Sequence, residues 1–132
     1  EDWSISENEK IKYYSGKANY TTTFNMETLP ENQETYLNLG ELSVMAKVKL
    51  NGKDLGGLWI APYRLNISKA IQKGENQLEI EVVNLWRNQL IKDKQRPEEE
   101  KYTWLVIDDI KPKSKLQSSG LLGPVVIESV KY

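Results

Sequence analysis

The sequence of 132 residues contains neither cysteine nor histidine. Without cysteine, disulfide bonds and thiolate sites are excluded. Without histidine, nucleophile–histidine relays, imidazole metal ligands and histidine general acid–base catalysis are excluded as well. The chain also lacks any apolar run approaching the roughly 20 residues that a membrane helix needs. Carboxylates and aromatic rings are therefore the groups left to consider for chemistry and binding.

The charge is nearly balanced, because 18 basic and 19 acidic residues give a formal net charge of −1. Such a balance creates no general attraction for nucleic acid or anionic lipid. The short basic stretch at Lys111, Lys113 and Lys115 has no interleaved aromatics, so it is interpreted as a solvated linker. We expect no nucleic-acid partner and no membrane partner.

The length fits a single domain over residues 1–132. Hydrophobic residues at 39% and charged residues at 28% are typical of a soluble globular protein. The chain starts without methionine or a signal segment, which predicts a fragment of a longer protein or a processed form.

A strand, a tight turn and a return strand are predicted from residue 44 onward. Apolar Val44, Ala46, Val48 and Leu50 alternate with other residues, as in a half-buried strand. The dipeptide 51–52, Asn-Gly, then favours a type I′ turn, because both central residues need positive φ. The same alternation returns over residues 75–85. These patterns indicate an all-β core.

The rest of the chain supplies further short strands separated by turn residues. Strands are expected at 17–24, 35–39, 62–67, 102–107 and 125–130, a helical turn at 68–74, and loops at 25–34 and 87–101. About eight short strands with regularly spaced turns predict a jelly-roll β-sandwich.

Several motifs resemble a known family. They are Tyr14-Ser15-Gly16-Lys17-Ala18-Asn19-Tyr20, Leu37-Asn38-Leu39-Gly40, the run Asn51-Gly52 to Trp59 and Pro62-Tyr63, Asn84-Leu85-Trp86-Arg87-Asn88-Gln89-Leu90-Ile91-Lys92-Asp93, Tyr102-Thr103-Trp104 and Ser119-Gly120-Leu121-Leu122-Gly123-Pro124-Val125. Together they resemble the galactose-binding-like sandwich domains of glycoside hydrolases, and the family 2 sugar-binding domain is similar. The resemblance is closest to the last domain of family 106 α-L-rhamnosidases. Gln89 and Lys92 depart from that pattern, where the family prefers Arg and Gly.

The resemblance, which covers roughly residues 13–130, implies a role as well as a fold. Such domains accompany a catalytic domain in multi-domain secreted or periplasmic glycosidases. In family 106 the catalytic carboxylates lie outside this domain. The resemblance therefore implies a non-catalytic, C-terminal accessory domain whose partner is the catalytic domain of the same enzyme, with plant or bacterial polysaccharide as a further candidate partner.

The carboxylates give no catalytic pair. A glycosidase needs two carboxyl groups about 5–9.5 Å apart around a sugar site. The candidates are Glu79 with Glu81, Asp108 with Asp109, and residues 98–100. The first pair is expected on the outward face of a strand, and the others in solvated ends and loops. No catalytic residue is assigned.

Aromatic and amide side chains near turns are the candidate binding residues. Sugars stack their C–H faces on aromatic rings and pair their hydroxyls with amide, carboxylate or guanidinium groups. The candidate carbohydrate-binding residues are Trp59, Tyr63, Arg64, Trp86 and Asn88. The alternative is that the tryptophans form a contact surface for the catalytic domain, in a purely structural module without sugar affinity.

A structural calcium ion is a further alternative. Calcium needs six to eight oxygen ligands, many from one loop. Asp93, residues 98–100, Asp108 and Asp109 are the candidate ligands, but no Asp-x-Asp-x-Asp-Gly spacing occurs. No metal site or cofactor is assigned.

Overall fold

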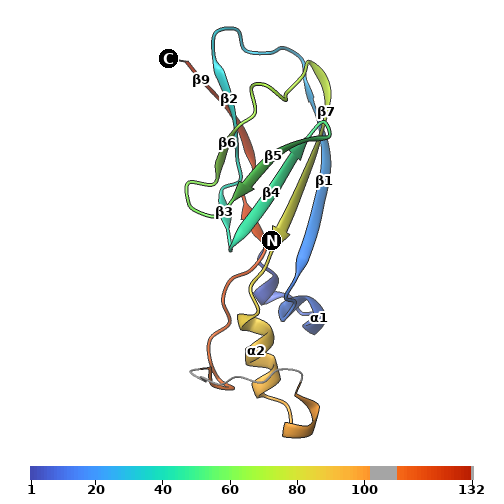
Figure 1. Cartoon of the computed structure of the whole chain (residues 1–132), viewed down its shortest axis with the longest axis vertical. Coiled ribbons are helices and arrows are strands. Elements are labelled where there is room, and N and C mark those ends of the chain that lie inside the picture. Colours follow the sequence, from blue (N-terminus) through green and yellow to red (C-terminus); the bar gives the residue numbers. More distant parts are fainter. Residues whose placement is uncertain (102–109, 132) are drawn as a thin grey trace.

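The computed structural model describes residues 1–101 and 110–131 (Figure 1). The strand expected at 102–107 lies outside these ranges. Two antiparallel sheets contain most of the strands of the described part. The four-stranded sheet has the order β1 (Lys17–Met26), β7 (Gly74–Val83), β4 (Met45–Leu50) and β5 (Lys53–Leu58). The three-stranded sheet has the order β6 (Arg64–Asn66), β2 (Glu34–Asn38) and β9 (Val126–Val130).

Smaller elements complete the described part of the chain. A pair formed by β3 (Glu41–Leu42) and β8 (Leu121–Gly123) accompanies the two sheets. The helical elements are η1 (Trp3–Ile5), α1 (Glu9–Lys12), α2 (Arg87–Lys94) and η2 (Glu98–Glu100). Figure 1 shows α1 and α2 gathered beyond one end of the sheets. None of the helices within residues 1–101 and 110–131 is long and apolar enough to cross a bilayer.

The hairpin between β4 and β5 confirms the turn prediction. Asn51 and Gly52 have φ values of 53° and 78°, as a type I′ turn requires. In the neighbouring β7, apolar residues alternate with charged ones, so Leu78, Ile80 and Val82 are buried while Glu79 and Glu81 lie on the outer face. β5 continues through two glycines to Leu58.

The inner faces of the sheets share one apolar core. It consists of Leu37, Leu39, Leu42, Ala46, Val48, Leu50, Ile67, Leu78, Ile80, Val82 and Leu121. Both sheets and the β3–β8 pair contribute to this set, so the core holds the layers together. The all-β class and the antiparallel sheets predicted from the sequence are confirmed.

The prediction of a loop throughout residues 87–101 is wrong, because α2 occupies Arg87–Lys94. This helix has no continuous apolar stripe. Ile91 is buried, but so are the polar residues Asn88 and Asp93. Lys92 lies 3.4 Å from a Glu9 carboxylate oxygen and 5.0 Å from the centre of the Tyr13 ring. Contacts with distant segments therefore stabilise a helix that hydrophobic periodicity alone does not reveal.

Candidate functional site

A groove of about 510 Å³ opens where the loop between β5 and β6 meets β3 and the segment before β8. Its walls come from three stretches of the chain, residues 38–43, 61–63 and 117–122. The lining residues are Asn38, Gly40, Glu41, Leu42, Ser43, Ala61, Pro62, Tyr63, Gln117, Ser118 and Leu122. Polar and apolar side chains are mixed in this set, as is typical of small-molecule sites.

The base of the groove depends on a glycine. Gly40 has a φ of 65°, and its N–H donates to the Asn38 Oδ1 atom at 2.9 Å. A Cβ atom at this position would lie 2.4 Å from the carbonyl carbon of Gly123. No real Cβ approaches a backbone carbon so closely. Glycine therefore allows β3 and β8 to come together beneath the groove.

One wall of the groove is clamped by Asn88 from α2. Its Nδ2 donates to the Gln117 carbonyl at 2.6 Å, and its Oδ1 accepts from the Gln117 N–H at 2.8 Å. Ser43 adds a second clamp, since its N–H donates to the Gly120 carbonyl at 3.1 Å and its hydroxyl to the Ser118 carbonyl. The backbone of this wall is therefore fixed from both sides.

The N-terminal segment reinforces the same wall. The Asp2 carboxylate accepts hydrogen bonds from Ser4 N–H at 2.9 Å and from Ser119 N–H at 3.0 Å. Burial by itself raises the pKa of Asp2, but the hydrogen bonds, led by the one from Ser119, outweigh it and lower the pKa below its ordinary value. The ionised form of Asp2 is therefore the one that holds residues 1–4 against the segment before β8.

Three polar side chains lining the groove have free ends. The Tyr63 hydroxyl, the Glu41 carboxylate and the Gln117 carboxamide make no hydrogen bond to any described residue. Tyr63 is nevertheless fixed at its backbone, because its carbonyl accepts from Leu39 N–H at 2.8 Å. The groove thus offers side-chain donors and acceptors that project from a hydrogen-bonded backbone.

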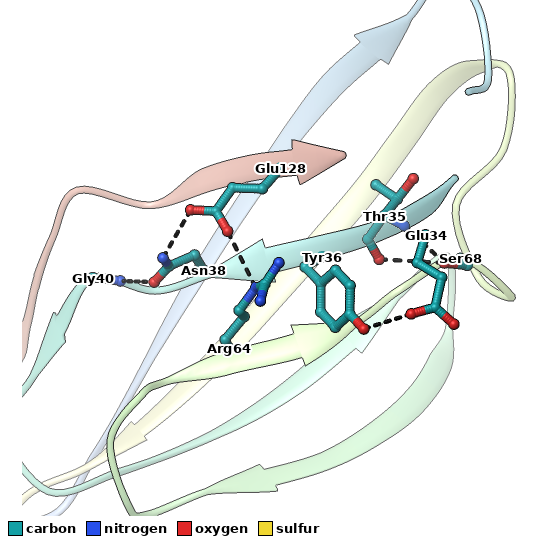
Figure 2. A network of polar contacts seen from close by, with 8 residues as sticks. All are labelled: Glu34, Thr35, Tyr36, Asn38, Gly40, Arg64, Ser68 and Glu128. Atoms are coloured by element: carbon teal, nitrogen blue, oxygen red, sulfur yellow. Dashed lines mark hydrogen bonds and ion pairs between the residues drawn. The ribbon is translucent and has the colours of Figure 1, made fainter. Parts of the chain in front are cut away.

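Arg64 belongs to a polar network on the outer face of the three-stranded sheet (Figure 2). Its Nε lies 3.2 Å from Glu128 Oε2, and its guanidinium carbon lies 3.9 Å from the centre of the Tyr36 ring. Asn38 Nδ2 donates to Glu128 Oε1 at 3.0 Å, and the Tyr36 hydroxyl donates to Glu34 at 2.6 Å. The Arg64–Glu128 contact has the distance of an ion pair but not the angle of a hydrogen bond. The network ties together β6, β2 and β9.

The five residues predicted from the sequence do not form one cluster around the groove. Tyr63 lines it, whereas Arg64 is held in the network described above. Trp59 is 64% exposed in the loop after β5, with its ring over Gly57. Trp86 is also 64% exposed and immediately precedes α2. Asn88 is only 2% exposed and both ends of its amide are taken by Gln117, so it supports the wall instead of facing a ligand.

Glu41 and Gln117 are groove residues that the sequence did not single out. They lie in segments far apart along the chain, and neither stands in a motif with distinctive chemistry. The only signal near them is the Ser-Gly-Leu-Leu-Gly-Pro run of residues 119–124, which marks the approach to the last strand. Folding brings the two side chains to one groove through β3–β8 pairing.

The acidic candidates are found on solvated surfaces. Glu79 and Glu81 lie on the outer face of the four-stranded sheet, where Glu81 is 3.3 Å from the Lys17 Nζ atom. Residues 98–100 are exposed in η2. Within the described ranges, no group of three acidic side chains could hold a metal ion. Asp108 and Asp109 lie outside these ranges.

Comparison with known proteins matches this chain to parts of glycosidases. Residues 1–118 match the family described as glycosyl hydrolase 2 galactose-binding domain-like. The chain is 40% identical to a Formosa agariphila protein whose name proposes a beta-glucuronidase, over 95% of this chain and 13% of that protein. A rhamnosidase structure from Novosphingobium sp. PP1Y is also 40% identical, with a TM-score of 0.83 over 95% of this chain and 12% of that one.

A more distant structure shows the same fold. The beta-D-glucuronidase of Dictyoglomus thermophilum is 21% identical, with a TM-score of 0.66 over 98% of this chain and 23% of that one. In all three comparisons the chain spans less than a quarter of the other protein.

Proposed function

Because this chain belongs to the glycosyl hydrolase 2 galactose-binding domain-like family, we propose that it is a non-catalytic accessory domain of a larger glycoside hydrolase. The enzyme would resemble an α-L-rhamnosidase, since a rhamnosidase structure aligns over 95% of this chain at 40% identity. The domain's task is to pack on the catalytic module and support its shape. The parent enzyme would act outside the cytoplasm, secreted or in the periplasm, where polysaccharide is accessible.

Exposed apolar side chains are the observation that carries this proposal. Trp59 and Ile60 are adjacent and are 64% and 72% exposed, and Leu85 and Trp86 are adjacent and are 48% and 64% exposed. Single exposed apolar residues are ordinary, but paired large ones in a folded domain are typical of interaction surfaces. The catalytic module of the same polypeptide is the partner that the relatives' greater length supports.

The test compares the isolated chain with the longer enzyme that contains it. The double substitution Trp59→Ser and Ile60→Ser should change the melting temperature of the isolated chain little, because both side chains are mostly exposed. In the longer enzyme the same change should lower the stability of the domain contact by about 2 kcal/mol or more, as expected for a buried aromatic anchor. Limited proteolysis should then release the domain faster.

A matched control comes from the loop between β1 and β2. Leu29→Ser also removes an exposed apolar side chain, from a residue that belongs to neither pair. This variant should leave both the chain and the longer enzyme unchanged. If limited proteolysis released the domain at the same rate from the Trp59/Ile60 double variant and from the unsubstituted enzyme, this surface would be ruled out as the contact.

A further inference from the structure

We infer that the free edge of β1 is a self-association site, through which two copies of this chain join their four-stranded sheets into one continuous sheet. This goes beyond packing on a catalytic module, because β1 contains neither of the exposed apolar pairs proposed for that contact. Three features of β1 support self-association: its unprotected edge, the direction of its free backbone groups and the symmetry of its sequence.

β1 is an edge strand without the usual protection against further pairing. Among the described strands only β7 pairs with it, and Figure 1 shows it along one side of the sheet. It is ten residues long, contains no proline, carries charge only at Lys17, and pairs with β7 without a register shift. Proteins usually blunt an exposed edge with a short strand, lysines, proline or a bulge, because an open edge is a template for another strand. The edge of β1 is therefore suited to receive one.

The outward backbone groups of β1 belong to its odd-numbered residues. Asn84 N–H donates to the Gly16 carbonyl at 2.8 Å, one step before Lys17 pairs with Val83. Hydrogen-bonded and non-hydrogen-bonded pairs alternate in an antiparallel ladder. The even-numbered residues of β1 therefore bond to β7, and the odd-numbered ones present their N–H and carbonyl groups to the free edge.

These outward groups are open over most of the strand. The Lys17 carbonyl accepts from the Tyr14 hydroxyl at 2.9 Å, which closes the edge at its start. The Thr23 carbonyl has a 3.5 Å contact with the hydroxyl of Thr22 beside it. Within residues 1–101 and 110–131, no other hydrogen bond reaches the outward groups of residues 19, 21, 23 and 25. The stretch 19–25 is thus available to a partner strand.

The sequence of this stretch is nearly symmetric about Thr22. An asparagine and an aromatic residue flank three threonines on either side, in Asn19-Tyr20-Thr21-Thr22-Thr23-Phe24-Asn25. A two-fold contact uses the same patch on both copies, so the patch must complement itself. Antiparallel pairing about Thr22 sets Thr21 of one copy opposite Thr23 of the other. It also sets asparagine opposite asparagine and aromatic ring opposite aromatic ring, and threonine and aromatic cross-strand pairs are favourable.

Charge favours the same register. Residues 18–26 carry no charge, so no like charges meet along the paired strands. Lys17 begins β1 and Glu27 follows its end, and the two-fold axis at Thr22 sets these opposite charges across from each other at both ends. Moving the axis to Thr21 or Thr23 would separate the charges and break the pairing of the asparagines.

An apolar groove lies where the second copy's strand would end. It has a volume of about 380 Å³, lies beside residues 17–20, and has Trp3, Ile11 and Tyr14 in its lining. Ile11 and Tyr14 are 44% and 41% exposed. Pairing about Thr22 brings residues 24–27 of the second copy alongside residues 17–20. The side chains of Phe24 and Met26 would then cover the exposed apolar surface of this groove.

Sedimentation equilibrium of the chain over a wide range of concentrations tests self-association, and we expect a monomer–dimer equilibrium. Thr21→Pro removes an outward N–H without removing a bond to β7, which is the situation in which edge strands tolerate proline. Each copy loses a hydrogen bond and meets the proline ring of the other, so dimerisation should weaken about tenfold or more. Thr21→Val is the matched control. It keeps the N–H and the β-branched shape, so it should dimerise as the unsubstituted chain does.

Amide hydrogen exchange of the unsubstituted chain locates the contact. In dilute solution the amides of residues 20, 22 and 24 should exchange slowly, because they bond to β7, whereas those of residues 19, 21, 23 and 25 should exchange fast. In concentrated solution the odd-numbered amides should become protected as well. This measurement does not depend on how the proline variant folds.

A chain that stays monomeric at every concentration would overturn the inference. The same conclusion would follow from a dimer that persists in Thr21→Pro with an unchanged far-UV circular dichroism spectrum, or from one that leaves the odd-numbered amides unprotected. Each of these results leaves the packing proposal standing, because that proposal is tested at Trp59 and Ile60 in the longer enzyme.

Discussion

Replacing Gly40 by alanine should destabilise the domain more than replacing a positive-φ glycine that has open space around it. The residue has a φ of 65°, a conformation that costs a residue with a Cβ about 1–2 kcal/mol. The new Cβ would also lie 2.4 Å from the Gly123 carbonyl carbon and 2.5 Å from its oxygen. Because both atoms belong to the backbone, β3 and β8 must move apart, and overpacking of this kind costs about 1–3 kcal/mol.

The two contributions sum to about 2–5 kcal/mol, a large part of the roughly 5–15 kcal/mol that stabilises a typical domain. Gly52 distinguishes the conformational cost from the steric cost. Its φ is 78°, but a Cβ there would meet nothing within 4 Å. Gly52→Ala should therefore lose only the conformational part, about 1–2 kcal/mol.

Urea unfolding followed by far-UV circular dichroism measures both variants against the unsubstituted chain. Gly40→Ala should show the lower midpoint of the two, with an unchanged slope. Equal losses for Gly40→Ala and Gly52→Ala would refute the close approach of Gly40 to Gly123 as the reason for glycine at this position.

Two further predictions concern the wall of the groove. Asn88→Ala leaves the N–H and carbonyl of Gln117 without their partner, so the free energy of unfolding should fall by about 1–3 kcal/mol in urea titrations. Gln89→Ala, on the same helix, should stay within about 0.5 kcal/mol, and a similar loss in both variants would contradict the clamp. Asp2→Asn should lower stability at neutral pH. The folded pKa of Asp2 is lowered, so its contribution is present above the ordinary carboxyl pKa and is lost as the pH falls through the folded value. Unfolding measured from neutral pH to about pH 3 should show the difference from the unsubstituted chain shrinking with acidity, and a constant difference would contradict this assignment.

Local patterns were sufficient for the strands of the two larger sheets and for the turn at Asn51-Gly52, but not for β3 and β8. The Asn51-Gly52 dipeptide predicted its turn because the required φ values depend on those two residues alone. The alternation around Ile80 predicted which face of β7 is buried because a sheet has a two-residue period. Both kinds of signal are contained within a few consecutive residues.

The groove and α2 could not be predicted in this way. Asn88 finds its partner 29 residues away, at Gln117, and no spacing rule links an amide to a distant backbone. Asn88 was predicted to bind sugar hydroxyls. Its burial depends on how α2 packs, and the sequence does not show that packing. Glu41 lies in β3 and Tyr63 immediately precedes β6, so the two belong to different sheets and reach one groove only in the folded chain.

The contact between Trp59 and Gly57 affects the entropy of the docking that we propose for this surface. A Cβ at Gly57 would lie 3.3 Å from the Trp59 Cζ3 atom, so the indole rests on bare backbone although most of its surface faces solvent. Its orientation is therefore set when the domain folds. Immobilising a mobile side chain at an interface costs about 0.5–1.5 kcal/mol, and a ring held in advance avoids most of that loss. A larger residue at Gly57 would push the ring or the strand aside by a few tenths of an ångström, and so change how Trp59 is presented without replacing any residue of the proposed contact surface.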